Sequence, residues 1–231
     1  MDFFTNTPSK YKIPDFNVLR KVWNTDFLKY KYNCIVTAED SYSDKVINVN
    51  LKDFLDNNKH CYVNNWRYYL DFPELTVGSL SSQTDLIDHL TKLDPNIFLP
   101  LIWCFIGDRG TGLSLHTDVL STRAWLAVFE GKKRVVLHPP VTDCLDKLNR
   151  ESKLILETSI PFGLWKVVDL EPGDILIIPE NWLHAALNME MTLAVTRNFV
   201  IADGLENTIK DMKCLGLDDL AMVIGGDVCI E

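Results

Sequence analysis

The sequence predicts a mainly β fold, a double-stranded β-helix of the jelly-roll or cupin type, with α/β elements before it and helices after it. From about residue 99 to 200, short apolar segments alternate with turns that contain Gly and Pro, which is typical of a β-sandwich or barrel. These segments number eight, the strand count of a jelly roll. The 231 residues fit one domain, because barrels of roughly 200–250 residues commonly form single units and no linker interrupts the chain.

Residues 1–98 are expected to support the barrel with short mixed elements. Apolar residues at helical spacing follow Pro14 up to Trp23, and a second short helical turn opens near Asp26. Residues 34–36 and 46–49 have the β-branched composition of strands, separated by a polar loop. Segments 52–57 and 85–93 are predicted as short helices, the second ended by Asp94-Pro95 because a residue before proline avoids the helical region.

The barrel itself is expected to consist of alternating, mostly buried strands. They are predicted at residues 101–106, 113–118, 124–129, 134–138, 165–170, 175–178, 184–188 and 193–199. The gap at 139–164 predicts a partly helical insertion at the mouth of the barrel. In the C-terminal segment, 201–231, Leu205, Ile209 and Met212 recur at helical spacing, so helices there should cap the barrel or form a homodimer with a second copy.

Composition limits the class of partner and the setting. The 23 Lys and Arg against 32 Asp and Glu give a formal charge of −9, which disfavours nucleic acid as a partner. The six cysteines form no C-x-x-C pair, which favours a reducing intracellular setting, cytoplasm or nucleus. The first residues lack the pattern of a signal peptide, and no apolar run is long enough for a membrane span.

The residues with the clearest chemical meaning are His116 and Asp118. Residues i and i+2 of a strand face the same way, so an imidazole and a carboxylate should project into one volume. The H-x-D tripeptide alone is a weak signal, but His184 supplies a third donor at the start of a later strand. Two histidines and one carboxylate on one face of a metal are the ligand set of non-haem Fe(II) oxygenases.

Such an oxygenase needs a co-substrate such as 2-oxoglutarate, whose carboxylate must meet a cation and hydroxyl donors. Lys132, Lys133 and Arg134 begin one strand, and alternation lets one of them point inward: Lys133 lies with Val135 and Leu137, and Arg134 lies with Val136 and His138. Thr196 and Asn198 share a face of the last strand and would need polar partners there.

Several segments together resemble the JmjC (jumonji-C) 2-oxoglutarate oxygenases. They are 110–118 (GTGLSLHTD), Ala124-Trp125, 130–137 (EGKKRVVL), 171–184 (EPGDILIIPENWLH), Asn188, and 196–199 (TRNF). The pre-barrel residues Asn65-Trp66 and Asp71-Phe72-Pro73 extend the likeness, which covers about residues 60–200. The sequence looks most like the small JmjC-only protein hydroxylases, such as lysyl hydroxylases.

The resemblance implies Fe(II), 2-oxoglutarate and O2 as cofactor and co-substrates. It implies His116, Asp118 and His184 as iron ligands and catalytic centre, and it implies Lys133, Thr196, Asn198, Asn188 and Trp125 as residues of the 2-oxoglutarate site. One departure is Leu126, which stands where some relatives have a polar residue that contacts the co-substrate. Relatives also contribute a tyrosine from before the first barrel strand, and the motifs above do not align it with a particular residue of this sequence.

The expected reaction is hydroxylation of a C–H bond in a protein or peptide side chain, with lysine the leading substrate, and release of succinate and CO2. Two enzymatic alternatives from the same family stay open: removal of an N-methyl group, and hydroxylation of a nucleoside in RNA. A third alternative is a metal-binding cupin that catalyses nothing and serves as a binding or scaffold protein.

Overall fold

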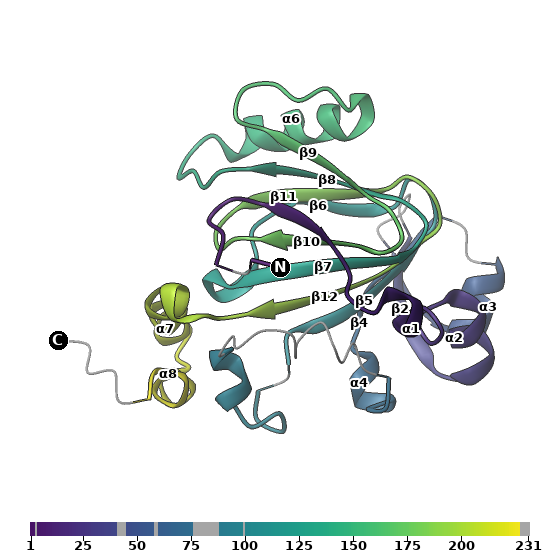
Figure 1. The fold of residues 1–231 in the computed structure, drawn as a ribbon, viewed down its shortest axis with the longest axis horizontal. Coiled ribbons are helices and arrows are strands. Elements are labelled where there is room, and N and C mark those ends of the chain that lie inside the picture. Colours follow the sequence, from purple (N-terminus) through teal and green to yellow (C-terminus); the bar gives the residue numbers. More distant parts are fainter. Residues whose placement is uncertain (3, 41–44, 58–59, 76–87, 99, 227–231) are drawn as a thin grey trace.

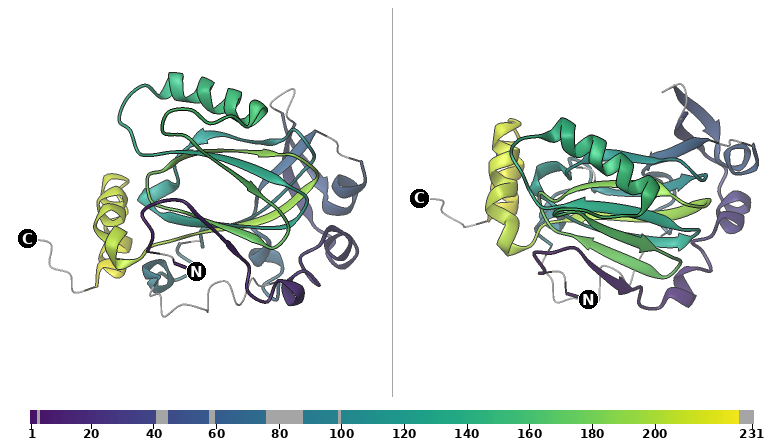
Figure 2. Two further views of the ribbon diagram at one scale, coloured as in Figure 1. Left: turned by 45° about the horizontal axis from the view of Figure 1, so that its top comes forward. Right: turned by 90° about the horizontal axis from the view of Figure 1, so that it is seen from above.

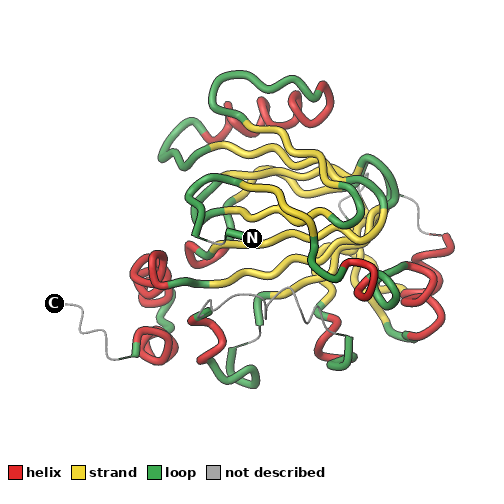
Figure 3. Tube along the Cα trace, in the orientation of Figure 1, coloured by secondary structure: helices red, strands yellow, loops and turns green. Residues whose placement is uncertain are grey.

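The computed structural model describes residues 1–2, 4–40, 45–57, 60–75, 88–98 and 100–226. Within them the chain forms an eight-stranded and a four-stranded antiparallel sheet that face each other (Figure 1). The larger sheet has the order β1-β10-β7-β12-β5-β4-β2-β3, and the smaller sheet has the order β6-β11-β8-β9. The helices lie around the two sheets rather than between them (Figure 3).

All eight strands predicted for the barrel are present, which confirms the jelly-roll prediction. They are β5 (Ile102–Gly107), β6 (Gly112–His116), β7 (Arg123–Glu130), β8 (Lys133–His138), β9 (Lys166–Leu170), β10 (Asp174–Ile178), β11 (Leu183–Asn188) and β12 (Thr192–Phe199). Four of them lie side by side in the larger sheet, and the other four make the whole smaller sheet. This arrangement brings the ends of β6 and β11 together at one end of the space between the sheets.

The space between the sheets is filled by every second residue of the strands. On β7, Ala124, Leu126 and Val128 pack into this inner cluster, together with Val135 and Leu137 of β8. The intervening β7 residues pack into a second cluster on the opposite face of the larger sheet. Both faces of the larger sheet are therefore buried at β7, which explains why this strand is a nearly continuous apolar run.

The N-terminal residues extend the larger sheet at both edges. Their strands are β1 (Ser9–Lys12), β2 (Ile35–Asp40), β3 (Val46–Asn50) and β4 (Cys61–Trp66), and their helices are α1 (Phe16–Leu19), α2 (Thr25–Lys31), α3 (Leu51–Asn57) and α4 (Tyr68–Asp71). The prediction missed β1 and β4, and it extended the first helix beyond Leu19. Most of the predicted helix at 85–93 lies outside the described residues or is irregular, and only the short 3-10 helix η1 (His89–Lys92) falls within it.

The insertion between β8 and β9 contains the amphipathic helix α6 (Leu145–Thr158), as the sequence predicts. It lies over the outer face of the smaller sheet (Figure 2). Leu148, Ile155 and Leu156 of this helix pack with Val136 and Leu183 of the sheet. The helix therefore covers a face that would otherwise be exposed and apolar.

The C-terminal segment forms η3 (Ala202–Gly204), α7 (Leu205–Cys214) and α8 (Asp218–Gly225) at one end of the sheets (Figure 1). Leu205 and Ile209 are 7% and 3% exposed and belong to a cluster with residues of η1 and α8. The predicted dimer face on these two residues is thus corrected, because they pack inside their own chain. The helices that the structure describes include none with the length and apolarity of a membrane span.

Candidate metal centre and adjoining cavity

His116, Asp118 and His184 come together in space, although His184 lies 66 positions beyond Asp118 in the chain. One donor atom of each residue lies within 4.8 Å of those of the other two. Antiparallel pairing sets His116 of β6 opposite His184 of β11, and their ring centroids are 4.2 Å apart. Asp118 follows the end of β6 in an extended conformation, so its side chain still points to the side of His116.

Backbone carbonyls fix the orientation of both imidazoles. Nδ1 of His116 lies 2.8 Å from the carbonyl oxygen of Ser114, and Nδ1 of His184 lies 3.0 Å from that of Trp182. Because a carbonyl only accepts, each Nδ1 carries the proton and each Nε2 offers its lone pair. Burial and the neighbouring His184 lower the pKa of His116, which favours the neutral, ligating form.

The Asp118 carboxylate indicates that the three residues form a cation site. Its Oδ2 is buried and has no hydrogen-bond partner among the described residues, and its ionic contact is with His184 Nε2 at 3.9 Å. An unpartnered buried carboxylate oxygen is costly unless a cation compensates it. Two neutral imidazoles and one carboxylate, with open space beside them, fit a divalent transition metal such as Fe(II).

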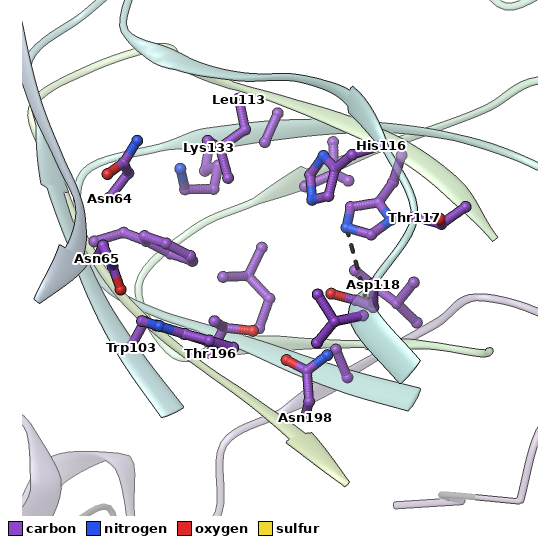
Figure 4. A pocket seen from close by; sticks show the side chains of 18 of the residues that line it. Asn64, Asn65, Trp103, Leu113, His116, Thr117, Asp118, Lys133, Thr196 and Asn198 are labelled. Atoms are coloured by element: carbon purple, nitrogen blue, oxygen red, sulfur yellow. Dashed lines mark ion pairs between the residues drawn. The ribbon is translucent and has the colours of Figure 1, made fainter. Parts of the chain in front are cut away.

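A cavity of about 430 Å³ extends from the three ligands into the space between the sheets. Figure 4 shows His116 and Asp118 toward one end of this cavity, Lys133 toward the other, and Thr196 and Asn198 on a facing wall. This volume is in the usual range for a small-molecule site. A bound molecule could therefore contact the metal ligands at one end and a lysine at the other.

Lys133 is the buried cation of this cavity. Its Nζ donates to Asn188 Oδ1 at 2.6 Å and to Tyr62 Oη at 3.2 Å, and it also lies over the rings of Tyr62 and Phe105. No carboxylate is among these contacts, so burial lowers the pKa of Lys133 to about 7. A ligand carboxylate would supply the missing negative charge.

Tyr62 is the residue that the sequence reasoning missed. It lies on β4, and its side chain lines the cavity beside Lys133. The available signal was the run Cys61-Tyr62-Val63, which has the composition of a strand. Nothing in the sequence shows that this strand joins the sheet next to β5, so the position of Tyr62 emerges only from the folded chain.

The structure places the other predicted polar residues around the same cavity. Thr196 and Asn198 line it, Thr196 Oγ1 donates to the Trp125 carbonyl at 2.8 Å, and Asn198 Nδ2 donates to Thr122 Oγ1 at 2.7 Å. Asn188 lies behind Lys133 rather than on the cavity wall. Its Oδ1 accepts from Lys133 Nζ, and its Nδ2 donates to Thr111 Oγ1 at 2.9 Å. Because Thr196 Oγ1 and Asn198 Nδ2 donate in these contacts, the lone pairs of Thr196 Oγ1 and of Asn198 Oδ1 remain for a ligand.

Trp125 corrects one expectation. Its side chain packs into the apolar cluster on the far face of the larger sheet and does not line the cavity, whereas its neighbours Ala124 and Leu126 do. Alternation along β7 forces this result, since Trp125 must face opposite to both neighbours. Leu126 therefore presents an apolar side chain to the cavity, at a position from which a polar side chain could contact a ligand.

Arg134, the neighbour of Lys133 in β8, faces away from the cavity. It points outward and forms a two-pronged ion pair with Asp169, with Nε–Oδ1 at 2.7 Å and Nη2–Oδ2 at 2.8 Å.

We expect Arg134→Gln to lower the free energy of unfolding by about 1–2 kcal/mol, since a partly buried pair is broken. Its affinity for 2-oxoglutarate should equal that of the parent. Urea unfolding and calorimetric titration measure the two quantities, and weaker 2-oxoglutarate binding would contradict the inward role of Lys133.

Comparison with known proteins agrees with this geometry, although no family model matches the chain. The lysine-specific demethylase JMJ21 of Arabidopsis thaliana is 27% identical over 213 residues, which cover 82% of this chain and 23% of the relative. The bifunctional arginine demethylase and lysyl-hydroxylase psr-1 of Caenorhabditis elegans is 28% identical over 124 residues, which cover 46% of this chain and 31% of the relative. The 2-oxoglutarate and iron-dependent oxygenase JMJD4 of Mus musculus is 28% identical over 115 residues, which cover 45% of this chain and 27% of the relative.

The matched parts make up about a quarter to a third of the length of these relatives. In this chain, the jelly roll supplies the two sheets, and the His-Asp-His group lies between them with a buried lysine farther along the same cavity. Similarity to several such proteins, a jelly-roll fold and this ligand group thus agree. The chain is thus similar to JmjC 2-oxoglutarate oxygenases in sequence, fold and ligand group.

Proposed function

We propose that the chain is an Fe(II)- and 2-oxoglutarate-dependent oxygenase that hydroxylates a C–H bond in a protein or peptide side chain. The observation that carries the proposal is one cavity with a three-residue metal site and, away from it, a buried lysine that has no carboxylate partner in the described part of the chain. This pairing matches a small molecule that chelates a metal at one end and carries a carboxylate at the other. 2-Oxoglutarate has both features.

The residues of the chain have separate roles in this proposal. His116, Asp118 and His184 would hold the iron, while Lys133 and Tyr62 would bind the distal carboxylate. Bound iron, with 2-oxoglutarate and O2, supplies the oxidation that yields succinate, CO2 and a hydroxylated product. The apolar walls, including Leu126 and Val135, exclude water from the site and so strengthen the ionic contacts inside it.

A polypeptide substrate is favoured by a second cavity beside the metal site. This cavity, of about 400 Å³, lies between β6 and α6 and shares His116 and Thr117 with the first. Half of its lining residues are apolar, and the polar half consists of His116, Thr117, Asp146 and Asn149, with no Lys or Arg among the described lining residues. A peptide crossing Thr117 could rest here, whereas a nucleic-acid backbone would find no cation among these residues.

Lysine is the proposed substrate residue. The chain carries a formal charge of −9, and the exposed Glu39 lies on the rim of the first cavity. Both charges would attract a cationic side chain. The named activities of the relatives, a lysyl-hydroxylase and demethylases of lysine and arginine, also concern basic side chains.

The test combines co-substrate turnover with product mass. The protein is incubated with Fe(II), ascorbate, 2-oxoglutarate and a peptide library rich in lysine, and succinate is measured alongside a His116→Ala control. We expect succinate that depends on His116 and peptides heavier by one oxygen atom. Loss of a methylene unit from methylated peptides, with formaldehyde, would instead show demethylation. Absence of succinate with bound metal would show a non-catalytic metal-binding protein.

Tyr62 gives a separate prediction for the co-substrate end of the cavity. Tyr62→Phe removes the hydroxyl 3.2 Å from Lys133 Nζ but keeps the ring over that nitrogen. We expect about 10-fold weaker 2-oxoglutarate binding, since one hydrogen bond to a charged group is lost. The affinity for Mn(II) should be unchanged, because the described hydrogen bond of the Tyr62 hydroxyl goes to Lys133 and not to a metal ligand. Equal weakening of both affinities would show a general disturbance of the fold.

A further inference from the structure

The segment after Asp118 has an unusual backbone. The short 3-10 helix η2 (Val119–Ser121) contains two successive left-handed residues, Leu120 with φ 56° and Ser121 with φ 47°. Residues other than glycine rarely adopt this conformation, and it costs free energy that neighbouring contacts must offset. The contacts that hold η2 should therefore be strong, and they should show what the conformation is for.

Ser121 joins three separate parts of the chain. Its Oγ donates to Asp211 Oδ2 of α7 at 2.7 Å and lies 3.1 Å from Asn181 Oδ1. Asn181 is itself left-handed, with φ 61°, and precedes the ligand His184 by three residues. One hydroxyl thus connects the segment that follows Asp118, the segment that precedes His184, and the C-terminal helix.

Leu120 anchors the same segment to the same helices. Its side chain packs against the cluster that contains Leu205 and Ile209 of α7 and Ile224 of α8. Within the segment, Thr122 Oγ1 donates to the Val119 carbonyl at 2.7 Å. The segment is therefore held by this local bond and by α7, which provides both an apolar contact and a hydrogen-bond acceptor.

Asp118 needs this support more than the two histidines do. His116 and His184 lie opposite each other in the β6–β11 ladder, so sheet hydrogen bonds fix their backbones. Asp118 lies two residues beyond the end of β6 and has no place in that ladder. Its position depends on η2, which begins directly after it.

We propose that Asp211 is a positioning residue for the metal ligand Asp118 and acts through Ser121. The inference rests on the proposed function, because it takes the three ligands as a metal site. The C-terminal helices would then serve the metal centre as well as the fold. A merely structural role for Asp211 would stabilise the chain without changing the affinity of the folded protein for a metal.

The test measures Mn(II) affinity of the full chain by electron paramagnetic resonance of the free ion, with thermal melting of each metal-free protein alongside. Asp211→Ala removes the acceptor, and Ser121→Gly removes the hydroxyl while suiting the left-handed backbone. We expect each to weaken Mn(II) binding about 10- to 100-fold, the usual effect of losing a partner that orients a ligand. Asp211→Asn keeps an acceptor oxygen and should stay within about 3-fold of the parent. The exposed Asp219 of α8 gives the matched control, and Asp219→Ala should bind Mn(II) like the parent.

The double variant provides a second criterion. If the two side chains act as one unit, Ser121→Gly with Asp211→Ala should bind no more weakly than either single variant. Parent-like Mn(II) affinity in the two single variants would overturn this inference and leave the proposed function standing. So would equal losses in Asp211→Asn and Asp211→Ala, since charge rather than the hydrogen bond would then matter. A parent that binds no Mn(II) or Fe(II) would overturn the proposed function, and this inference with it.

Discussion

Asp118→Ala is expected to lower divalent-metal affinity by more than about 100-fold and to reduce succinate formation to the level of a metal-free sample. Partners that merely orient a ligand contribute about 10- to 100-fold, so loss of the charged ligand itself should exceed that range. The metal-free variant should be as stable as the parent or more stable, by about 1 kcal/mol, because Asp118 Oδ2 is buried with no hydrogen-bond partner that the structure describes. Mn(II) titration, succinate analysis and urea unfolding measure these three quantities.

The control for this variant is Thr117→Ala, at the exposed position between the two ligands. Figure 4 shows the Thr117 side chain directed away from His116 and Asp118. Its metal affinity should match that of the parent. A marked loss of stability in metal-free Asp118→Ala would contradict the assignment, since it would show that the carboxylate supports the fold rather than a metal.

Lys133 gives the second large effect, a dependence of 2-oxoglutarate affinity on pH. Burial lowers the pKa of Lys133 to about 7, and only the protonated amine can pair with a carboxylate. The amine is therefore charged below pH 7 and increasingly neutral above it, so each further pH unit should weaken binding by up to about tenfold. Binding restores the charge, so it should also take up a proton near pH 7.5–8, which calorimetry in buffers of different ionisation enthalpy detects.

Lys133→Met is the matching variant, because methionine has a similar length and no charge. It should weaken 2-oxoglutarate binding by about 2–5 kcal/mol, roughly 30- to several thousand-fold, since the carboxylate would be buried without its partner. The dependence on pH above 7 should disappear with it. Parent-like affinity would assign the carboxylate to another residue, and a retained pH dependence would assign the titration to another group.

The barrel was predictable because its signals are local. Each of the eight strands is a short apolar run ended by turn residues, and the structure has a strand at each of these places. Alternation along β8 also placed Lys133 with Val135 and Leu137, and the structure buries all three between the sheets. Local periodicity thus showed that Lys133 and Arg134 face opposite ways, and the resemblance to the JmjC oxygenases pointed to Lys133 as the one in the cavity.

Trp125 shows where a resemblance outweighed that same rule. Alternation with Ala124 and Leu126 places its side chain on the far face of β7, and the structure confirms this position. The error lay in treating a motif position as a cavity position. Tyr62 shows the opposite case, because no local pattern links β4 to the cavity, and only the pairing of β4 with β5 brings it beside Lys133.

The sequence by itself determined the eight barrel strands, which residues of a strand share a face, and the three ligand candidates, because these depend on periodicity and residue chemistry over a few positions. Only the tertiary structure decided how Tyr62 meets Lys133, how α7 and α8 pack on η1 and η2, and how Asp211 reaches Ser121. These contacts join residues 71 and 90 positions apart. Such long-range pairing depends on the packing of the whole chain, since many partners are compatible with any one local pattern.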